Sequence, residues 1–348
     1  MGTVYYLFVL CLGHIIFLKL KKVSGMEDKQ PLLSICIPTY NRAALLDNVL
    51  KLYTQNKYFD ERIEIVISDN CSEDNTSDVC KKYTSQFPNV TYYRNSTNLV
   101  DGNFAKALSH GKGKYLRLVN DYCYMDDEAL LETYEIIKKY SKTNKLLFFY
   151  NSCWGITDKF IETTSLDSFV ATASNRVTWI SNFGCWKEDF FTLDDWNRCI
   201  KKQFCQIDWT LRLVSNKPFS VIVNYPLLKQ LPIGNTKSGY NFFKVHLDNY
   251  FSMYDEYIEK RMLSQKILKM DKHKVLRYWI GEQIVILLFV KNKTEFSFDT
   301  SDAFIITFKH YKYSLLYYYY LLIGCFCWVL VKISMFDTIK KILKTILA

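Results

Sequence analysis

The amino-acid sequence predicts an α/β protein with a Rossmann-like, mostly parallel sheet that carries helices on both faces, followed by a helical C-terminal region. Three observations lead to this fold class. Short apolar runs alternate with segments of helical apolar spacing between residues 32 and 150. Polar residues directly follow three of those runs. The last third of the chain, including residues 242–258 and 275–290, has apolar residues at helical spacing.

The composition is that of a folded protein with a sizeable core. Hydrophobic residues make up 49% and charged residues 23% of the 348 residues, which suits one large domain or about two. The eleven cysteines form no CxxC pair and no Cys/His zinc spacing, which favours a reducing compartment. We find no helix-turn-helix, zinc-finger or aromatic RNA-binding signature, so nucleic acid is not an expected partner despite the net charge of +10.

Five apolar runs are predicted to form strands. The first covers residues 32–37 and stops at Pro38, as expected for a buried strand. The others cover residues 63–68, 90–94, 115–120 and 146–150.

Helices are predicted between these strands. Asn41 is placed to cap the first helix, and Asp126 or Asp127 the fourth. The apolar positions expected to face the sheet are Leu45, Leu46, Val49, Leu50 and Tyr53, then Val79, Cys80, Tyr83 and Phe87, then Phe104, Ala105, Ala107 and Leu108, and finally Leu130, Leu131, Tyr134, Ile137 and Tyr140.

Polar residues after three of the strands are expected to meet at one edge of the sheet, because ligands of open α/β sheets bind beyond the carboxyl ends of the strands. These residues form the segments 38–42, 68–70 and 120–121. No GxGxxG sequence follows the first strand and no Walker A loop is present, which disfavours a dinucleotide-binding or P-loop domain.

Three separated motifs resemble those of a family 2 glycosyltransferase of the bacterial surface-polysaccharide type. They are PTYNR at residues 38–42, DNCSEDNT at residues 69–76, and GKY at residues 113–115 leading into Asn120 and Asp121. The resemblance implies the GT-A fold and an enzyme of hexosyltransferase type. It also implies inverting transfer from a nucleoside-diphosphate sugar, commonly a UDP-sugar, to a saccharide or lipid-linked acceptor.

The resemblance also implies which residues bind the nucleotide-sugar. Asp69 suits hydrogen bonds from the base or ribose, whereas Ser72, Asp74 and Thr76 suit the start of the second helix. Asn98 and Asn103 match polar positions of the family, but they equally suit loop and capping roles. The expected binding residues are Pro38, Thr39, Tyr40, Asn41, Arg42, Asp69, Asn70, Asn120 and Asp121.

The predicted metal site departs from the family pattern. The family usually has a second carboxylate two residues after the first, and this chain has Cys123 there. Asp121 is therefore the expected ligand of a divalent cation, Mg²⁺ or Mn²⁺, which prefers oxygen donors. Asn120 offers a neutral oxygen, and binding is expected to be weaker than usual.

Asp208 is the expected general base for the acceptor hydroxyl, because it lies before a helix-spaced apolar segment, as the resemblance requires. The alternative is a carboxylate that only favours the helix dipole. Asp189, Asp194 and Asp195 are alternates. Trp179, Trp186 and Trp209 suit an acceptor-stacking platform, although packing in the core is the simpler role for each.

Both ends of the chain bear on membrane contact. Residues 4–18 are apolar apart from His14, too short to span a bilayer readily, and residues 1–25 suit either an anchor or an extension that precedes the true start. Residues 314–331 carry no charge and are flanked by lysines, and residues 335–347 have an amphipathic pattern. Residues 256–348 also carry a net charge of +7, so we expect the protein at the cytoplasmic face of the membrane, lying in the interface rather than spanning it.

The predicted organisation is an N-terminal segment (residues 1–25), a GT-A domain (residues 26–235) and a helical, membrane-associating region (residues 236–348). Two other classes of function remain open: a catalytically weak protein that binds nucleotide-sugars, and a membrane scaffold. A nucleotidyltransferase is disfavoured, because residues 38–42 are not a phosphate-binding loop rich in glycine and basic residues.

Overall fold

The computed structural model describes residues 30–233, 237–290 and 296–332. Its main sheet has five strands in the order β3-β2-β1-β4-β8. Strands β1 to β4 run parallel, and β8 is antiparallel to β4. The strands are β1 (Leu33–Thr39), β2 (Ile63–Asp69), β3 (Val90–Arg94), β4 (Tyr115–Leu118) and β8 (Gly184–Trp186).

Helices cover both faces of this sheet, as the alternation of side chains along each strand requires. Leu33, Ile35 and Ile37 of β1 pack in one apolar cluster with α2 (Ala43–Thr54), α3 (Thr76–Thr84) and α5 (Asp127–Tyr140). Cys36 faces the other side and packs in a second cluster with α4 (Gly102–Ser109). The four predicted helices and the first four predicted strands are therefore confirmed, with shifts of a few residues at their ends.

The fifth predicted strand lies in a second sheet rather than in the main one. β6 (Leu146–Tyr150) pairs in parallel with β9 (Ser220–Asn224), and β7 (Phe160–Thr163) pairs antiparallel with β9. The position beside β4 is taken by β8. Tyr115 of β4 connects the sheets, because its hydroxyl donates to the backbone oxygen of Leu147 at 2.6 Å. Two further short strands, β5 (Cys123–Tyr124) and β10 (Lys229–Gln230), pair with each other.

The remaining elements between β7 and β9 are helices. They are α6 (Leu166–Ala173), η1 (Ser174–Thr178), η2 (Ile180–Asn182), α7 (Lys187–Phe191), η3 (Ile200–Lys202) and α8 (Cys205–Asn216).

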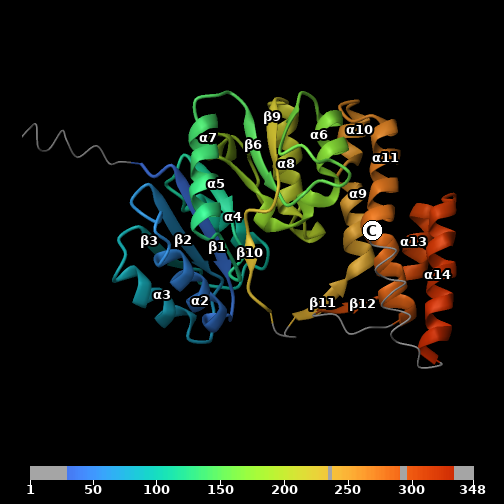
Figure 1. The fold of residues 1–348 in the computed structure, drawn as a ribbon, viewed down its shortest axis with the longest axis horizontal. Coiled ribbons are helices and arrows are strands. Elements are labelled where there is room, and N and C mark those ends of the chain that lie inside the picture. The colour runs from blue at the N-terminus through green and yellow to red at the C-terminus, as the bar shows by residue number, and fades with distance from the viewer. Residues whose placement is uncertain (1–29, 234–236, 291–295, 333–348) are drawn as a thin grey trace, which may run out of the picture.

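The C-terminal region is mainly helical, as predicted, and lies at the end of the molecule opposite β3 (Figure 1). It packs on the rest of the chain, because Leu276 and Ile280 belong to the same apolar cluster as Phe148 and Phe169. Its elements are β11 (Lys237–Asn241), η4 (Lys244–Asn249), α9 (Tyr250–Ser252), α10 (Asp255–Glu259), α11 (Gln265–Val275), η5 (Leu276–Ile280), α12 (Gly281–Gln283), η6 (Ile284–Val290), β12 (Phe296–Asp299), α13 (Ala303–Tyr311) and α14 (Leu315–Lys332).

Within the described part of the chain, no helix is both long enough and apolar enough to cross a membrane. The apolar segment at residues 4–18 and the amphipathic segment at residues 335–347 lie outside the described residues.

Candidate functional site

A cavity of about 840 Å³ lies beyond the carboxyl ends of β1, β2 and β4. This is the edge at which the sequence predicts a ligand site. The cavity includes eight of the nine predicted binding residues; Asp69 is not among the described residues that line it. The lining residues are Pro38, Thr39, Tyr40, Asn41, Arg42, Ala43, Ala44, Leu45, Asn70, Asp74, Asn98, Val100, Asp101, Asn103, Phe104, Asn120, Asp121 and Ile180.

The turn after β1 is shaped by Asn41, which has a left-handed backbone with φ of 51°. Asparagine tolerates this conformation better than most residues. Its side-chain oxygen accepts from the backbone N–H of Glu73 at 2.8 Å, and its own N–H donates to Ser72 Oγ at 2.9 Å. The prediction that Asn41 caps α2 is wrong, because its side chain is used to join the turns after β1 and β2.

Asp74 stabilises the start of two helices. One carboxylate oxygen accepts from the backbone N–H of Thr76 at 3.1 Å, and the other accepts from the N–H of Ala43, in the first turn of α2, at 2.9 Å. Burial opposes ionisation, but these hydrogen bonds outweigh it and lower the pKa of Asp74. The contacts are those expected of a structural carboxylate, at a position that also lines the cavity.

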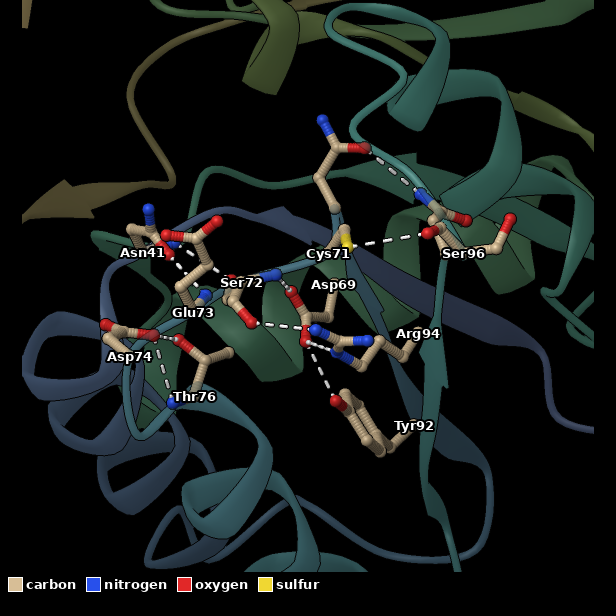
Figure 2. A network of polar contacts seen from close by, with 12 residues as sticks. Asn41, Asp69, Cys71, Ser72, Glu73, Asp74, Thr76, Tyr92, Arg94 and Ser96 are labelled. Carbon is tan, nitrogen blue, oxygen red and sulfur yellow. Dashed lines mark hydrogen bonds and ion pairs between the residues drawn. The ribbon is translucent and has the colours of Figure 1, made fainter.

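Asp69 is the centre of the network shown in Figure 2. Its side chain is fully buried. One oxygen accepts from the backbone N–H of Ser72 at 2.8 Å. The other accepts from the Tyr92 hydroxyl at 2.8 Å and lies 3.6 Å from Arg94 Nε. Burial, with the charge of Asp69 beside it, raises the pKa of Tyr92 to about 12. Asp69 therefore holds the loop after β2, and its contact with a nucleotide stays a prediction.

The next residue, Asn70, does line the cavity and holds the loop opposite. Its side-chain N–H groups donate to Asn98 Oδ1 at 2.7 Å and to the backbone oxygen of Val100 at 3.2 Å. Its oxygen accepts from the N–H of Leu99 at 2.8 Å. Asn103 is anchored to Ser68 in a similar way, with Nδ2 2.8 Å from the backbone oxygen of Ser68. Asn98 and Asn103 both make loop contacts, as one of the two interpretations expects. Both also line the cavity, which the other interpretation, a role in the binding site, would require.

Asp121 lies on the cavity wall and is 3% exposed. Thr39 Oγ1 donates to one carboxylate oxygen at 2.9 Å, and Arg42 Nη1 donates to the other at 2.8 Å. The Arg42 guanidinium also lies 5.7 Å from the centre of the Tyr122 ring. Asn120 beside it is fixed by Ser181, whose Oγ accepts from the Asn120 backbone N–H at 2.9 Å. The site thus combines a buried carboxylate with an arginine that has further N–H donors.

The residues present fit a divalent cation only in part. The described residues contain no group of three or more His, Cys, Asp or Glu side chains that would form a metal site. The Cys123 side chain is fully buried in the apolar cluster under α2 and α5, so it does not take the place of the second carboxylate. Asp121 offers one carboxylate, which is enough for Mg²⁺ when diphosphate oxygens and water supply the remaining ligands.

Asp208 lies in the first turn of α8 and is 2% exposed. Its carboxylate pairs with two arginines: Arg198 Nε lies 2.7 Å from one oxygen, and Arg212 Nη2 lies 3.1 Å from the other. The structure does not bring Asp208 to the described lining of the cavity.

The alternate bases do not line the cavity either, among the residues described. Asp189 pairs with Lys217 at 3.0 Å, and Asp194 has an almost fully exposed side chain that pairs with Arg212 at 2.8 Å. Asp195 adopts a left-handed backbone with φ of 33°.

Trp209 and Trp186 make the packing contacts that were the simpler of the two expectations for these tryptophans. Trp209 is fully buried and packs edge-on against Phe183 and Phe190. Trp186 donates its indole N–H to the backbone oxygen of Lys145 at 2.8 Å. Trp179 lines a cavity that is separate from the one described above. The positions of the tryptophans in the sequence do not reveal which indole rings pack in the core.

Several residues that line the cavity lie outside the sequence motifs. Val100, Asp101 and Phe104 belong to the loop before α4 and the start of that helix, and Ile180 belongs to η2. Asn98, Asp101 and Gly102 are a sequence signal for a loop, but nothing in their order indicates that the loop folds over the ends of β1 and β2.

Comparison with known proteins agrees with this geometry. The family model described as Glycosyl transferase family 2 matches residues 34–192, which contain the cavity and all three motifs. Over these residues the chain is similar to glycosyl transferase family 2. The prediction of a GT-A-like α/β fold with a mostly parallel sheet is thereby confirmed.

Individual relatives match shorter stretches of the chain. Abequosyltransferase RfbV of Salmonella typhimurium is 39% identical over 108 residues, which are 30% of this chain and 32% of RfbV. A GalNAc(5)-diNAcBac-PP-undecaprenol beta-1,3-glucosyltransferase of Campylobacter jejuni is 31% identical over 102 residues, 29% of this chain and 31% of that protein. The chain thus spans about a third of the length of either relative. The crystal structure of S. aureus TarS matches with a TM-score of 0.49 and 16% identity, covering 74% of this chain and 46% of TarS.

Proposed function

We propose that this protein transfers a sugar from a nucleoside-diphosphate donor, a UDP-sugar, to a saccharide or lipid-linked acceptor in the synthesis of a cell-surface polysaccharide, with inversion at the transferred carbon. The observation that carries the proposal is the cavity at the ends of β1, β2 and β4, where Arg42 and Asp121 meet within a family 2 region. The relatives support the acceptor class, since the C. jejuni protein is named for an undecaprenol-linked acceptor.

The cavity offers what a charged donor requires. Arg42 uses one N–H on Asp121 and has other guanidinium N–H groups for diphosphate oxygens, for which the arginine fork is well suited. Its side chain is 17% exposed, so it remains within reach of a ligand. In this proposal Asp121 holds a divalent cation, which when bound supplies positive charge to the departing nucleotide.

We assign the acceptor-side base to Asp208. Asp208 lies at the start of α8. In the same turn of the helix, Gln206 donates to the backbone oxygen of Thr178 at 2.6 Å. Thr178 lies two residues before Ile180, which lines the cavity, so the start of α8 is tied to the cavity wall.

Arg198 donates to one carboxylate oxygen of Asp208, whereas the other lies 3.1 Å from Arg212 Nη2 but accepts no hydrogen bond within the described chain, so this second oxygen is the one placed to take the proton. If it is the base, Asp208→Asn abolishes transfer while UDP binding persists. If its role is only structural, Asp208→Asn lowers the melting temperature and the residual folded protein retains activity.

The donor site is tested by thermal stability of the full chain with UDP, GDP, CDP and ADP, each with and without Mn²⁺. A ligand at about 100 times its Kd adds roughly 2.7 kcal/mol to the free energy of unfolding. We expect a shift with UDP that depends on Mn²⁺ and is lost in Asp121→Ala. Asp78→Ala is the matched control, because Asp78 is an exposed carboxylate on α3. No shift with any nucleotide overturns the proposal in favour of a scaffold. A shift without any sugar transfer indicates a nucleotide-sugar-binding protein.

We further propose that α13 and α14 place the protein on the cytoplasmic face of a membrane as a peripheral or monotopic protein. Both helices expose apolar side chains, with Ile305 72%, Leu315 89% and Leu322 71% exposed. Lys312, between the two helices, and Lys309, in the last turn of α13 and 2.8 Å from Asp248, suit anionic headgroups.

Sedimentation with phosphatidylglycerol vesicles tests this placement. The protein should sediment with these vesicles, and the double variant Leu315→Glu/Leu322→Glu should stay in solution. Phe219→Glu is the matched control, since Phe219 is 55% exposed before β9. Equal sedimentation of the double variant and the native chain contradicts the assignment of this surface.

A further inference from the structure

A second cavity, of about 330 Å³, lies on the other side of the segment that borders the donor cavity. Three tryptophans from distant parts of the chain line it: Trp154, Trp179 and Trp279. Arg176 and several side-chain amides complete the lining. No acidic side chain is among the described lining residues. Aromatic faces with a few directed polar groups are the usual composition of a small-molecule site.

The polar groups of this cavity have unsatisfied hydrogen-bonding capacity. Asn175 is 6% exposed and Asn182 is 3% exposed, yet within the described chain no donor reaches the Oδ1 atom of either. Buried amide oxygens in folded proteins are normally hydrogen-bonded, so these two side chains of the cavity wall have acceptors that a ligand would satisfy once the amides turn toward the cavity. Sugar hydroxyls are donors suited to such acceptors.

Arg176 adds a positive charge without a carboxylate beside it. Its guanidinium stacks over the Trp154 ring at 4.8 Å from the ring centre, and Nε has no acceptor in the described part of the protein. None of the ion pairs between described residues includes Arg176, whereas Arg42, Arg198 and Arg212 all contact carboxylates. A largely buried cation is costly unless an anion compensates it, and a guanidinium suits phosphate or carboxylate.

The turn at residues 179–182 places the two cavities beside each other. Ile180 lines the donor cavity, and its neighbours Trp179 and Asn182 line the second one. Ser181 Oγ is 2.9 Å from the backbone nitrogen of Asn120, the residue before Asp121. A molecule in the second cavity is therefore separated from the donor cavity only by this short turn.

We infer that the second cavity binds one part of the acceptor, whose attacking hydroxyl extends past the turn to the donor cavity, and that this part carries a negative charge, a phosphate or a carboxylate, that pairs with Arg176. The inference rests on the proposed glycosyl transfer and specifies its acceptor class. The indole rings pack on the sugar rings, the Asn175 and Asn182 oxygens accept from hydroxyls once their amides turn toward the cavity, and Arg176 selects the charge.

Tryptophan fluorescence of the full chain tests this assignment, with UDP and Mn²⁺ present in excess so that the donor cavity is filled. The probes are glucose 1-phosphate, glucuronate and methyl glucoside, which separate phosphate, carboxylate and uncharged sugar. We expect saturable quenching by one of the two charged sugars, with at least tenfold weaker binding of methyl glucoside. Arg176→Gln should remove this preference, and Trp154→Ala should weaken binding of every probe.

Two variants serve as controls. Arg62→Gln removes an arginine that also stacks on a ring, that of Tyr134 at 4.7 Å, but is paired with Asp60. Trp328→Phe removes an exposed indole on α14. Both should bind the charged sugar as the native chain does.

The stabilisation by UDP is measured on the same samples and separates the two proposals. If UDP stabilises every variant but no charged sugar quenches the native chain, the acceptor assignment is overturned and the donor proposal stands. If Arg176→Gln binds the charged sugar as tightly as the native chain, the assignment of Arg176 is overturned. If UDP has no effect but quenching depends on Arg176, the saccharide site is supported and the donor proposal fails.

Discussion

Replacing Asp271 by asparagine should remove a cost to stability that the native chain has at neutral pH and largely lacks in acid. Asp271 lies on α11 and is fully buried. Ser174 Oγ donates to one carboxylate oxygen, and the Tyr250 and Tyr254 hydroxyls lie 2.9 and 3.3 Å from the other. These donors do not fully replace water, and burial raises the pKa of Asp271 from 3.8 to about 6.

The sign follows from proton linkage. The folded state binds this proton more tightly than the unfolded state, so the contribution of Asp271 to stability is complete below pH 3.8 and is lost as the pH rises through about 6. A difference of about two pKa units corresponds to about 3 kcal/mol, of which about 2 kcal/mol falls between pH 4.5 and 7.5. Asparagine does not ionise and does not pay this cost.

Urea denaturation of both proteins at several pH values measures the effect. The free energy of unfolding of Asp271→Asn relative to the native chain should rise by about 2 kcal/mol from pH 4.5 to 7.5. Asp126→Asn is the control with the opposite sign, because Lys229 and the backbone N–H of Ala129 lower the pKa of Asp126. A difference between Asp271→Asn and the native chain that stays constant with pH would refute the reasoning.

Two further substitutions test how the sheet and the turn after β1 are built. Gly184→Ala should destabilise the fold by about 1–3 kcal/mol, since a Cβ there would lie 2.6 Å from the Tyr115 hydroxyl; Gly102→Ala, with its nearest neighbour at 3.4 Å, is the control, and equal melting temperatures would contradict the prediction. Asn41→Ala should lower the free energy of unfolding by about 2 kcal/mol, through left-handed backbone strain and the lost hydrogen bond to Glu73, measured by urea denaturation. Asn41→Gly relieves the strain, so an equal loss in both variants would show that the backbone conformation is not the cause.

The sequence was most informative where a pattern is local. Residues 63–68 and 90–94 form strands as expected, because a short apolar run between turns has few other ways to bury its side chains. Asp126 caps α5 as predicted, with its carboxylate 3.0 Å from the backbone nitrogen of Ala129. The edge of the sheet that holds the cavity followed from the same local patterns, since the carboxyl ends of parallel strands coincide.

Features that depend on distant residues were not visible. Whether Asp69 or Asn70 faces the cavity depends on which way the strand end turns, and the contacts of Asp69 with Tyr92 and Arg94 decide it. The place of residues 146–150 in a second sheet depends on β9, more than 70 residues later in the chain. The roles of Trp179, Trp186 and Trp209 also depend on packing rather than on their spacing in the sequence.

The turn at residues 179–182 has a thermodynamic consequence, because its residues form part of the wall of two cavities. A molecule that binds on one side and orders this turn lowers the entropic cost of ordering it when a second molecule binds on the other side. The resulting coupling free energy must be the same in both directions. If both cavities bind as proposed, occupancy of the cavity beside Asp121 should change the affinity beside Arg176 by the same factor by which occupancy beside Arg176 changes the affinity beside Asp121.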